Sequence, residues 1–502
     1  MPGDARMKKV TLIYPGAPAS GNIVSRTASL RLPLSILYLA RPLLDMGYEV
    51  KVVDMRVTPL AVEDMAGSVC AGISSMTGVQ ILHGITAARA IRARFPDMPL
   101  VWGGIHPTFF PEQTVESGHA DIVVRHEGDV TFPQLVEALR SSGRGDDVLA
   151  QVEGITWRAG DGSIRSTPNR HPADMDQVGL PAYELVDVDR YFNIRDTFDY
   201  QSSRGCPFRC GFCYNKRFNF GRWRPKSADK VIDEMTYLHR TYGVRCFSSV
   251  DDEFFIKADR SGAIAEGLIK YGRKFEWSGF CRFDTFSRFD DDLIRTIKAS
   301  GVDQMFFGAE SGNVDTLKMV KKCITLDQVQ TTIARTRQFG IRPVVSFVAG
   351  FPGESEATLS DTLDLYDKIM ALNPASEING IFIYTPYPGA DLYAKAVEHG
   401  FVPPASLEEW GRWNFNYDVG HPWLSQGMVS AIRTIAAIAR FRFFSKEFVG
   451  RNRSRPGLVA AFKALNAPME FLADLRWNRR WWAAPYEWRL WGWAVKKVLG
   501  TF

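Results

Sequence analysis

The sequence predicts an α/β protein made of two successive α/β units and a helical carboxyl-terminal region. Short apolar segments alternate with helical segments between residues 10 and 124, and again between residues 197 and 384. This alternation is typical of parallel sheets whose strands are joined by helices. A turn-rich segment separates the two arrays, and the alternation stops near residue 405. A chain of 502 residues is also too long for one core, so about three domains are expected.

The first array has the order of a parallel, doubly wound sheet. Helical spacing of apolar residues predicts one helix from Leu34 to Met46, ending before Gly47, and another at 79–95. Strand-like segments occur at 10–15, 49–54, 70–76, 99–105 and 121–124. Such sheets bind ligands beyond the carboxyl ends of their strands, where SSMTG, GGIHPT and HEGD fall. We assign residues 1–145 to this Rossmann-like unit.

Residues 146–195 are expected to link the two units. GRGDD and AGDGS, which lie in or just before this stretch, have the composition of turns, and HPADMDQVGLPAYELVD has the pattern of an extended linker.

The second array, residues 196–404, predicts an open barrel. The helical segment Ser227–Tyr242 places its apolar residues on one face and ends at Gly243. Strands are predicted near 197–203, 245–251, 275–281, 303–308, 342–349 and 378–384. Six strand–helix units correspond to a partial (β/α)6 barrel, in which chemistry takes place at the carboxyl end of the strands.

Residues 405–502 are expected to be mainly helical and are strongly basic. From residue 440 onward there are 13 Lys and Arg against 4 Asp and Glu, whereas the preceding residues are slightly acidic. Six of the 13 tryptophans lie between Trp477 and Trp493, interleaved with basic residues. Such a segment can pack as a helical cap or lie in an anionic membrane interface, and both remain open. The acidic body argues against nucleic acid binding.

Cysteine usage and hydropathy favour a cytoplasmic protein. The seven cysteines are unevenly spaced, and the amino terminus has no signal-peptide pattern. Disulfides are therefore not expected. No run of 18 apolar residues predicts a transmembrane helix.

The segment SSRGCPFRCGFCYN contains three cysteines within eight residues, Cys206, Cys210 and Cys213. Structural zinc needs four ligands, and no His or Cys follows until His239 and Cys246. A [4Fe–4S] cluster held by three cysteines leaves one iron open for a further ligand. Zinc or incidental cysteines remain the alternative. The other four cysteines are expected to be small buried hydrophobes.

This C-x3-C-x2-C segment resembles the radical S-adenosylmethionine (SAM) superfamily. In that family the open iron chelates SAM, and one electron from the cluster cleaves SAM to a 5′-deoxyadenosyl radical. The strand ends SSVDDEFF, CRFDTF and GAESGN fit the same family, although Asp251 and Asp252 replace its more usual Gly-Gly-Glu. The resemblance implies a SAM site formed by Phe212, Asp251, Asp252, Arg282, Glu310 and Ser311.

The first unit resembles cobalamin-binding domains. The dinucleotide fingerprint G-x-G-x-x-G is absent after the first strand. Instead, the strand ends ISSMT and WGGIHPT are similar to segments that line the slot for the cobalamin tail. The residues implied are Ser74, Ser75, Met76, Thr77, Gly103, Gly104, His106 and Glu127. The family's Asp-x-His-x-x-Gly motif is missing, so we expect no histidine to replace the displaced base. His106 as a plain polar turn residue, or the whole unit as a docking module, are the alternatives.

The resemblance covers about residues 8–400, and LPAYELVD and EEWGRWNFNYD are similar to one branch of cobalamin-dependent radical SAM enzymes. That branch contains the anaerobic magnesium-protoporphyrin ester cyclase, bacteriochlorophyll side-chain methylases and hopanoid methylases. It implies methylation of an unactivated carbon in a small apolar or natural-product substrate, with flavodoxin or ferredoxin as electron donor. A cyclase using cobalamin as redox partner, or a cofactor-binding sensor, are the alternatives. A tRNA methylthiolating enzyme fits poorly, because the first unit has no second cysteine triplet.

Overall fold

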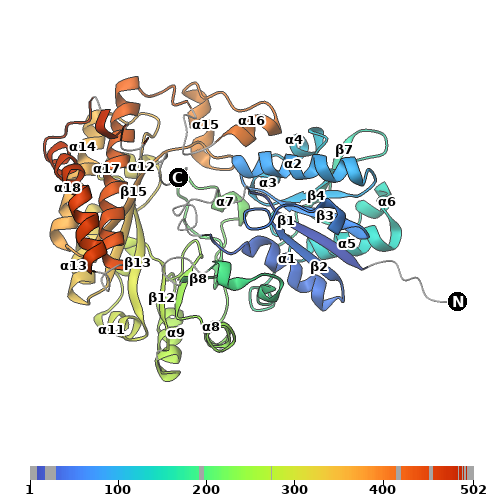
Figure 1. The fold of residues 1–502 in the computed structure, drawn as a ribbon, viewed down its shortest axis with the longest axis horizontal. Helices are drawn as coiled ribbons and strands as arrows, with labels where there is room; N and C mark the ends of the chain where they lie inside the picture. The colour runs from blue at the N-terminus through green and yellow to red at the C-terminus, as the bar shows by residue number, and fades with distance from the viewer. Residues whose placement is uncertain are drawn as a thin grey trace.

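The computed structural model describes residues 8–16, 30–191, 197–272, 274–413, 420–451, 456–483, 486–488, 490 and 493. Two α/β units lie side by side in Figure 1, and long helices cover the far side of the second unit. The α/β fold class with a helical carboxyl-terminal region is therefore confirmed.

The first unit contains a seven-stranded sheet in the order β2-β1-β3-β4-β5-β6-β7. The first five strands are parallel: β1 (Lys9–Tyr14), β2 (Glu49–Asp54), β3 (Ser68–Ser74), β4 (Leu100–Gly103) and β5 (Ile122–Val124). Their helices are α1 (Leu34–Asp45), η1 (Val62–Met65), α2 (Val79–Arg94), α3 (Ile105–Phe109), α4 (Pro111–Glu116), α5 (Thr131–Ser142) and α6 (Asp146–Leu149). The central strands are nearly continuous apolar runs because helices cover both faces.

The first sheet continues beyond residue 145, where the sequence placed the end of this unit. β6 (Ile155–Arg158) pairs antiparallel with β5, and β7 (Ile164–Ser166) pairs antiparallel with β6. The predicted turn AGDGS joins these two strands. Strands of four and three residues at a sheet edge carry too little alternation to be recognised, so the segment expected to be a linker supplies two strands. Only η2 (Tyr183–Leu185) and η3 (Val188–Tyr191) follow before residue 192.

The second unit is an open, all-parallel sheet in the order β15-β14-β13-β12-β11-β8. Its strands are β8 (Thr197–Tyr200), β11 (Cys246–Ser249), β12 (Glu276–Phe280), β13 (Val302–Glu310), β14 (Arg342–Ala349) and β15 (Glu377–Ile383). The helices on its outer face are α8 (Ala228–Tyr242), α9 (Ala258–Lys270), α10 (Phe283–Phe286), α11 (Asp291–Ala299), α12 (Val314–Met319), α13 (Leu326–Gln338) and α14 (Glu356–Leu372). α8 begins at the N-cap Ser227 and ends at the left-handed Gly243 as the sequence predicts.

The cysteine segment lies between two short elements at the mouth of this barrel. β9 (Ser203–Arg204) pairs antiparallel with β10 (Arg224–Pro225), and α7 (Asn215–Phe218) lies between them in the chain. Figure 1 shows α7 between the two units.

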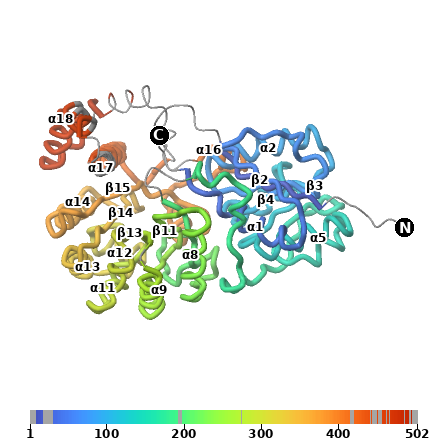
Figure 2. Tube along the Cα trace, turned by 60° about the horizontal axis from the view of Figure 1, so that its bottom comes forward, coloured from blue at the N-terminus to red at the C-terminus, as the bar shows by residue number. Residues whose placement is uncertain are grey.

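The carboxyl-terminal helices α17 (Gln426–Arg451) and α18 (Pro456–Asn478) stack outside β15 and α14 (Figure 2). Met428, Ile432, Ile435 and Ile438 of α17 are buried in the barrel core. Trp477 packs on Tyr366, and its Nε1 donates to Asp367 at 2.7 Å. Trp481 and Trp493 are exposed. The tail therefore packs in part, whereas Arg489, Trp491, Lys496 and Lys497 lie outside the described residues.

A segment after the barrel reaches back to the first unit. α15 (Asp391–Glu398) and α16 (Leu407–Arg412) extend from the second unit over α2 and α3 (Figure 1). The fully buried Trp410 of α16 packs on His106 and Phe110, with ring centroids 5.5 and 5.1 Å apart. The Oε1 atom of Glu408 lies 3.0 Å from Nε2 of His119. This contact joins the hydrophobic cores of the two units.

Across the described ranges, no helix combines the length and apolar character that crossing a bilayer requires.

We expect Trp410→Ala to loosen the contact between the units. Removing a buried Trp costs about 3–5 kcal/mol, and the Nε1 atom of Trp410 has no hydrogen-bond partner among the described residues, so packing accounts for the loss. Thermal unfolding followed by circular dichroism measures the shift. The control is Phe471→Ala, because Phe471 is 67% exposed, and its transition is expected to stay close to wild type. Equal shifts in the two variants would contradict the assignment.

Candidate functional site

A cavity of about 440 Å³ lies where the carboxyl ends of the two sheets face each other. From the first unit it is lined by Ser74, Ser75, Met76, Gly103, Gly104 and Glu127, six of the eight residues predicted there. From the second unit it is lined by Tyr214, Asn215, Phe218, Asn219 and Asp252. The residues from the first unit lie at or just after the carboxyl ends of β3, β4 and β5, where parallel sheets bind ligands.

The deep end of the cavity is apolar and depends on close backbone approach. Leu12, Val101, Val124 and Phe132 line it together with Gly72. A Cβ atom on Gly72 would lie 2.9 Å from Leu12 and 3.0 Å from Phe132. Gly104 has φ +99°, and a Cβ there would lie 2.6 Å from the carbonyl oxygen of Ser75. The backbone conformation at position 104 therefore requires glycine, whether or not a ligand needs the space beside it.

Thr77 and His106 do not line this cavity, in contrast to the expectation. His106 is fully buried, with Nδ1 3.0 Å from the Thr77 hydroxyl and its ring against Trp410. Burial lowers the pKa of His106 to about 3, which keeps the ring neutral. His106 belongs to the contact between the units and Thr77 holds its ring, so we do not retain these two residues as cobalamin ligands. His126, which the sequence analysis did not single out, does line the cavity.

Backbone contacts anchor the loop that carries Cys206, Cys210 and Cys213 on both sides. Gly211 N donates to Val320 O at 2.7 Å, and Leu392 N donates to Gly211 O at 2.8 Å. Gly205 has φ +83°, and its N–H donates to Asp252 at 3.1 Å. The loop is therefore held by the segments that follow β11, α12 and β15.

The three cysteines fit a cluster better than a single ion. In the described part of the chain, no three His, Cys, Asp or Glu side chains form a group that would hold one metal ion. A [4Fe–4S] cluster binds each thiolate on a different iron, so its cysteines need not converge on one point. Burial raises the pKa of Cys206 and Cys213 to about 12, and the positive charge of iron would overcome this barrier to thiolate formation.

Arg282 faces the cysteine loop. Its Nη1 lies 3.7 Å from the sulfur of Cys210, and its guanidinium stacks 3.8 Å from the ring centroid of Phe208. Nε donates to Asp284 at 2.8 Å, and Nη2 donates to the carbonyl of Lys322 at 2.5 Å. Arg282 therefore brings a fixed positive charge to the sulfur ligands, in addition to the role toward SAM that the resemblance implies.

The two adjacent aspartates have different roles. Asp251 is buried and accepts hydrogen bonds from Ser202 N, Ser202 Oγ and Ser203 Oγ at 2.5–2.7 Å. It therefore holds the strand that leads into the cysteine loop, and it does not face the cavity. Asp252 lines the cavity and bonds Asn215 and Gly205. Burial raises the pKa of Asp252 despite these two bonds.

Glu310 and Lys322 form a buried ion pair at the end of β13. Glu310 has φ +61°, and its Oε1 lies 2.7 Å from Nζ of Lys322. Burial lowers the pKa of Lys322, but the charges of Glu310 and Cys210 outweigh this and raise it overall. Ser311 is buried, and its hydroxyl oxygen lies 3.1 Å from the Thr362 hydroxyl oxygen. The same Ser311 hydroxyl accepts a hydrogen bond from Asn313 N. Ser311 thus fixes the turn at this strand end.

The structure adds two residues that the sequence analysis missed. Glu253 is buried beside the loop, its Oε1 accepts from Arg282 N at 3.0 Å, and burial raises its pKa to about 8. Lys322 follows α12, and the only feature of the sequence that could have pointed to it is its place in a Lys-Lys pair. Phe212, the predicted adenine neighbour, is half-buried with its ring 6.0 Å from that of Phe351.

Comparisons with known proteins match both units. The model described as the B12 binding domain matches residues 23–136, and the Radical SAM superfamily model matches residues 200–366. An uncharacterized methyltransferase of Pyrococcus horikoshii is 30% identical over 406 residues, 79% of this chain and 84% of its own. The chain belongs to the B12-binding radical SAM family. The family prediction is confirmed.

Two further relatives agree with this assignment. The anaerobic magnesium-protoporphyrin IX monomethyl ester cyclase of Synechocystis is 27% identical, covering 82% of this chain and 81% of its own. The structure of the cobalamin-dependent SAM radical enzyme OxsB has the same fold, with a TM-score of 0.66 at 17% identity over 99% of this chain and 77% of OxsB. This protein is thus a cobalamin-dependent radical SAM enzyme, and its cofactors are a [4Fe–4S] cluster, SAM and cobalamin.

We expect Asp251→Asn to lose bound iron and Asp252→Asn to keep it. The amide in the Asp251 variant turns an NH2 group toward hydroxyl donors, and each lost buried bond costs about 1–3 kcal/mol. Iron and sulfide analysis after anaerobic reconstitution measures the cluster content. Equal cluster content in the two variants would contradict the division of roles between them.

We expect Gly308→Ala to weaken SAM binding about tenfold, or about 1.4 kcal/mol. A Cβ there would lie 2.2 Å from Oε1 of Glu310 and 2.8 Å from Nζ of Lys322, so this ion pair must move. Equilibrium binding of SAM to the reconstituted protein measures the effect. Gly427→Ala is the control, because its Cβ meets only the Ser425 hydroxyl at 3.8 Å. Unchanged SAM affinity in the Gly308 variant would remove the pair from the proposed SAM site.

Proposed function

We propose that this enzyme methylates an unactivated carbon of a small substrate. The observation that supports the proposal most strongly is that one cavity is lined by strand ends of both units, with Ser75 and Gly104 on one side and Tyr214 and Asp252 on the other. Methyl transfer to carbon requires a methyl donor and a radical source beside the same substrate atom. Bound in place, cobalamin would supply the methyl group, and SAM at the cluster would supply the radical that removes the hydrogen.

The protein's own residues would prepare this space. Cys206, Cys210 and Cys213 would hold the cluster, with Arg282 beside Cys210 and Asp251 holding the strand behind the loop. The apolar end formed by Leu12, Gly72 and Phe132 would bind the cobalamin tail and exclude water.

An apolar substrate is supported by the inner face of the barrel. In β13, Met305 and Phe307 are buried on the helical side, so Phe306 points to the opposite, inner face. Phe280 of β12 stacks on Phe306 with centroids 5.1 Å apart. Phe280 and Phe382 are 43% and 40% exposed. Large exposed aromatic side chains at a barrel mouth are suited to an uncharged, apolar group.

The reaction also requires an electron donor, and we propose a flavodoxin or ferredoxin in the cytoplasm. Arg209 in the cysteine loop and Arg217 in α7 are exposed. Lys216 and Lys321 share a single acid, Asp391, at 3.1 and 3.5 Å. This surface is basic although the first 439 residues are acidic overall, which is complementary to an acidic carrier. Membrane contact by the exposed Trp481 and Trp493 stays a prediction.

The second candidate function is an oxidative cyclisation, favoured by the 27% identity to the magnesium-protoporphyrin cyclase. The two functions differ in the fate of the SAM methyl group, because only a methyltransferase moves it into the product.

We expect trideuteromethyl SAM to label the product. Reconstituted enzyme, dithionite and labelled SAM would be incubated with a metabolite extract from cells lacking the protein, and mass spectrometry would detect trideuterated products. Cys213→Ala is the control and is expected to form neither labelled product nor 5′-deoxyadenosine. An unlabelled new product from wild-type enzyme would favour the cyclase. Absence of SAM cleavage by wild type would favour a sensor, and cleavage by Cys213→Ala would overturn the cluster assignment.

A further inference from the structure

Two arginines lie side by side next to the cysteine loop. Arg204 of β9 and Arg224 of β10 are directly opposite each other in an antiparallel pair, and Cys206 follows Arg204 by two residues. Like charges opposite each other destabilise such a pair. Acidic partners must therefore compensate the two guanidinium groups.

Those acidic partners come from the other unit. Asp129 accepts from both guanidinium ends of Arg204, at 2.7 and 3.0 Å. Glu127 accepts from Arg204 at 3.2 Å and also from Arg224. Glu127, Gly128 and Asp129 follow β5 and line the cavity assigned to cobalamin. The loop that would contact cobalamin is thus bound directly to the loop that would hold the cluster.

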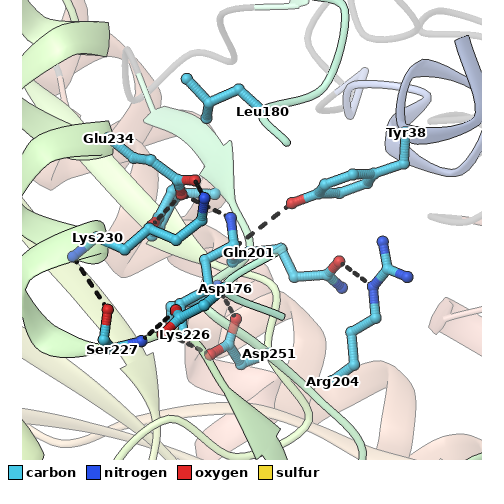
Figure 3. A network of polar contacts seen from close by, with 12 residues as sticks. Tyr38, Asp176, Leu180, Gln201, Arg204, Lys226, Ser227, Lys230, Glu234 and Asp251 are labelled. Atoms are coloured by element: carbon cyan, nitrogen blue, oxygen red, sulfur yellow. Dashed lines mark hydrogen bonds and ion pairs between the residues drawn. The ribbon is translucent and has the colours of Figure 1, made fainter. Parts of the chain in front are cut away.

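The side chains of this network are largely shielded from solvent. The side chains of Arg204, Glu127 and Asp129 are 11%, 9% and 13% exposed. Arg204 also donates to Gln201 at 2.9 Å and stacks against Tyr38 at 4.6 Å, and Figure 3 shows its guanidinium beside that ring. The desolvation cost of a buried ion pair offsets much of its attraction, so such a network serves orientation more than stability.

A rigid turn connects this network to the cysteines. Gly205, between Arg204 and Cys206, has φ +83°, and a Cβ there would lie 2.0 Å from the carbonyl oxygen of Arg222. Its N–H donates to Asp252, which lines the same cavity. Gly205 therefore links Arg204 in the chain to Cys206 and by a hydrogen bond to the cavity residue Asp252.

We propose that Arg204 is a positioning residue that couples cobalamin binding to the cluster loop. With the cluster in place, the loop and Arg204 are ordered, and Arg204 holds Glu127 and Asp129 in the conformation that receives cobalamin. Coupling of this kind is reciprocal, so bound cobalamin would also stabilise the cluster loop. The inference requires the two cofactors but not methyl transfer, and it is tested without a substrate.

The test compares hydroxocobalamin affinity in two forms of the full-length chain, with the cluster reconstituted and with all three cysteines replaced by Ala. Wild type is expected to bind hydroxocobalamin at least about fivefold more tightly with the cluster present. Asp129→Asn removes one charge from the network and is expected to bring this ratio close to one. A wild-type ratio of one, or an undiminished ratio in Asp129→Asn, would overturn the proposal.

A matched control and a conservative variant separate positioning from general destabilisation. Asp64→Asn breaks an exposed pair with Lys51 in the same unit, at 3.3 Å, and is expected to keep the wild-type ratio. Arg204→Lys keeps the charge but loses the bidentate ion pair with Asp129, so we expect an affinity ratio between that of wild type and one. If circular dichroism shows Asp129→Asn to be unfolded, Arg204→Lys takes its place in the test.

Electron paramagnetic resonance gives an independent readout. Relaxation of cob(II)alamin by the reduced cluster depends on the distance between them, and we expect it to weaken in Asp129→Asn and to be unchanged in Asp64→Asn. Wild-type relaxation in Asp129→Asn, with normal iron content, would also overturn the positioning role.

Discussion

Three hydrogen bonds to the buried carboxylate of Asp251 set the geometry of the whole site. The carboxylate accepts them from Ser202 and Ser203, across the boundary between the end of β11 and the end of β8. Removing a carboxylate from water is costly unless protein groups replace its hydrogen bonds. These three bonds therefore favour a single conformation of the chain that leads to Cys206. That conformation in turn determines the positions of Arg204, of the cysteine loop and of the cavity wall.

Charges around the cysteine loop are arranged in compensated groups. Arg282 approaches Cys210 while bound to Asp284, and Lys322 is neutralised by Glu310. On the side of the first unit, Arg204 and Arg224 are balanced by Glu127 and Asp129. In a site of low dielectric, fixed charges act strongly on a bound cofactor or substrate. The oppositely charged partners keep these charges oriented before the cofactor or substrate binds. The site is therefore preorganised on both sides of the cavity.

The two units are joined by contacts of different kinds. On one side an apolar contact is made by Trp410 against His106 and Phe110, and on the other Arg204 makes ion pairs. Apolar packing gives affinity without direction, whereas the bidentate ion pair fixes orientation. Together they hold the two sets of strand ends facing one cavity, which is the arrangement that a two-cofactor reaction needs.

Local features of this protein could be predicted from the sequence. Periodicity and turn residues located the parallel strands of both units, because each strand and helix buries its own apolar face. The spacing of Cys206, Cys210 and Cys213 indicated a three-cysteine cluster, since ligand number is a property of a single loop. Strand-end motifs also singled out Ser75 and Gly104 for cobalamin and Asp252 for SAM, and all three line the cavity.

The sequence could not show which of the motif residues face the cavity and which hold its walls together, because this depends on contacts made in the folded chain. Asp251 and Asp252 are neighbours in the chain, yet one is enclosed by serines and the other faces the cavity, because the turn that follows β11 directs their side chains differently. His106 packs under Trp410, more than 300 residues later in the chain. The partners of Arg204 and of Glu310 are likewise remote or unmarked in sequence, since ion pairing depends on distances that only folding creates.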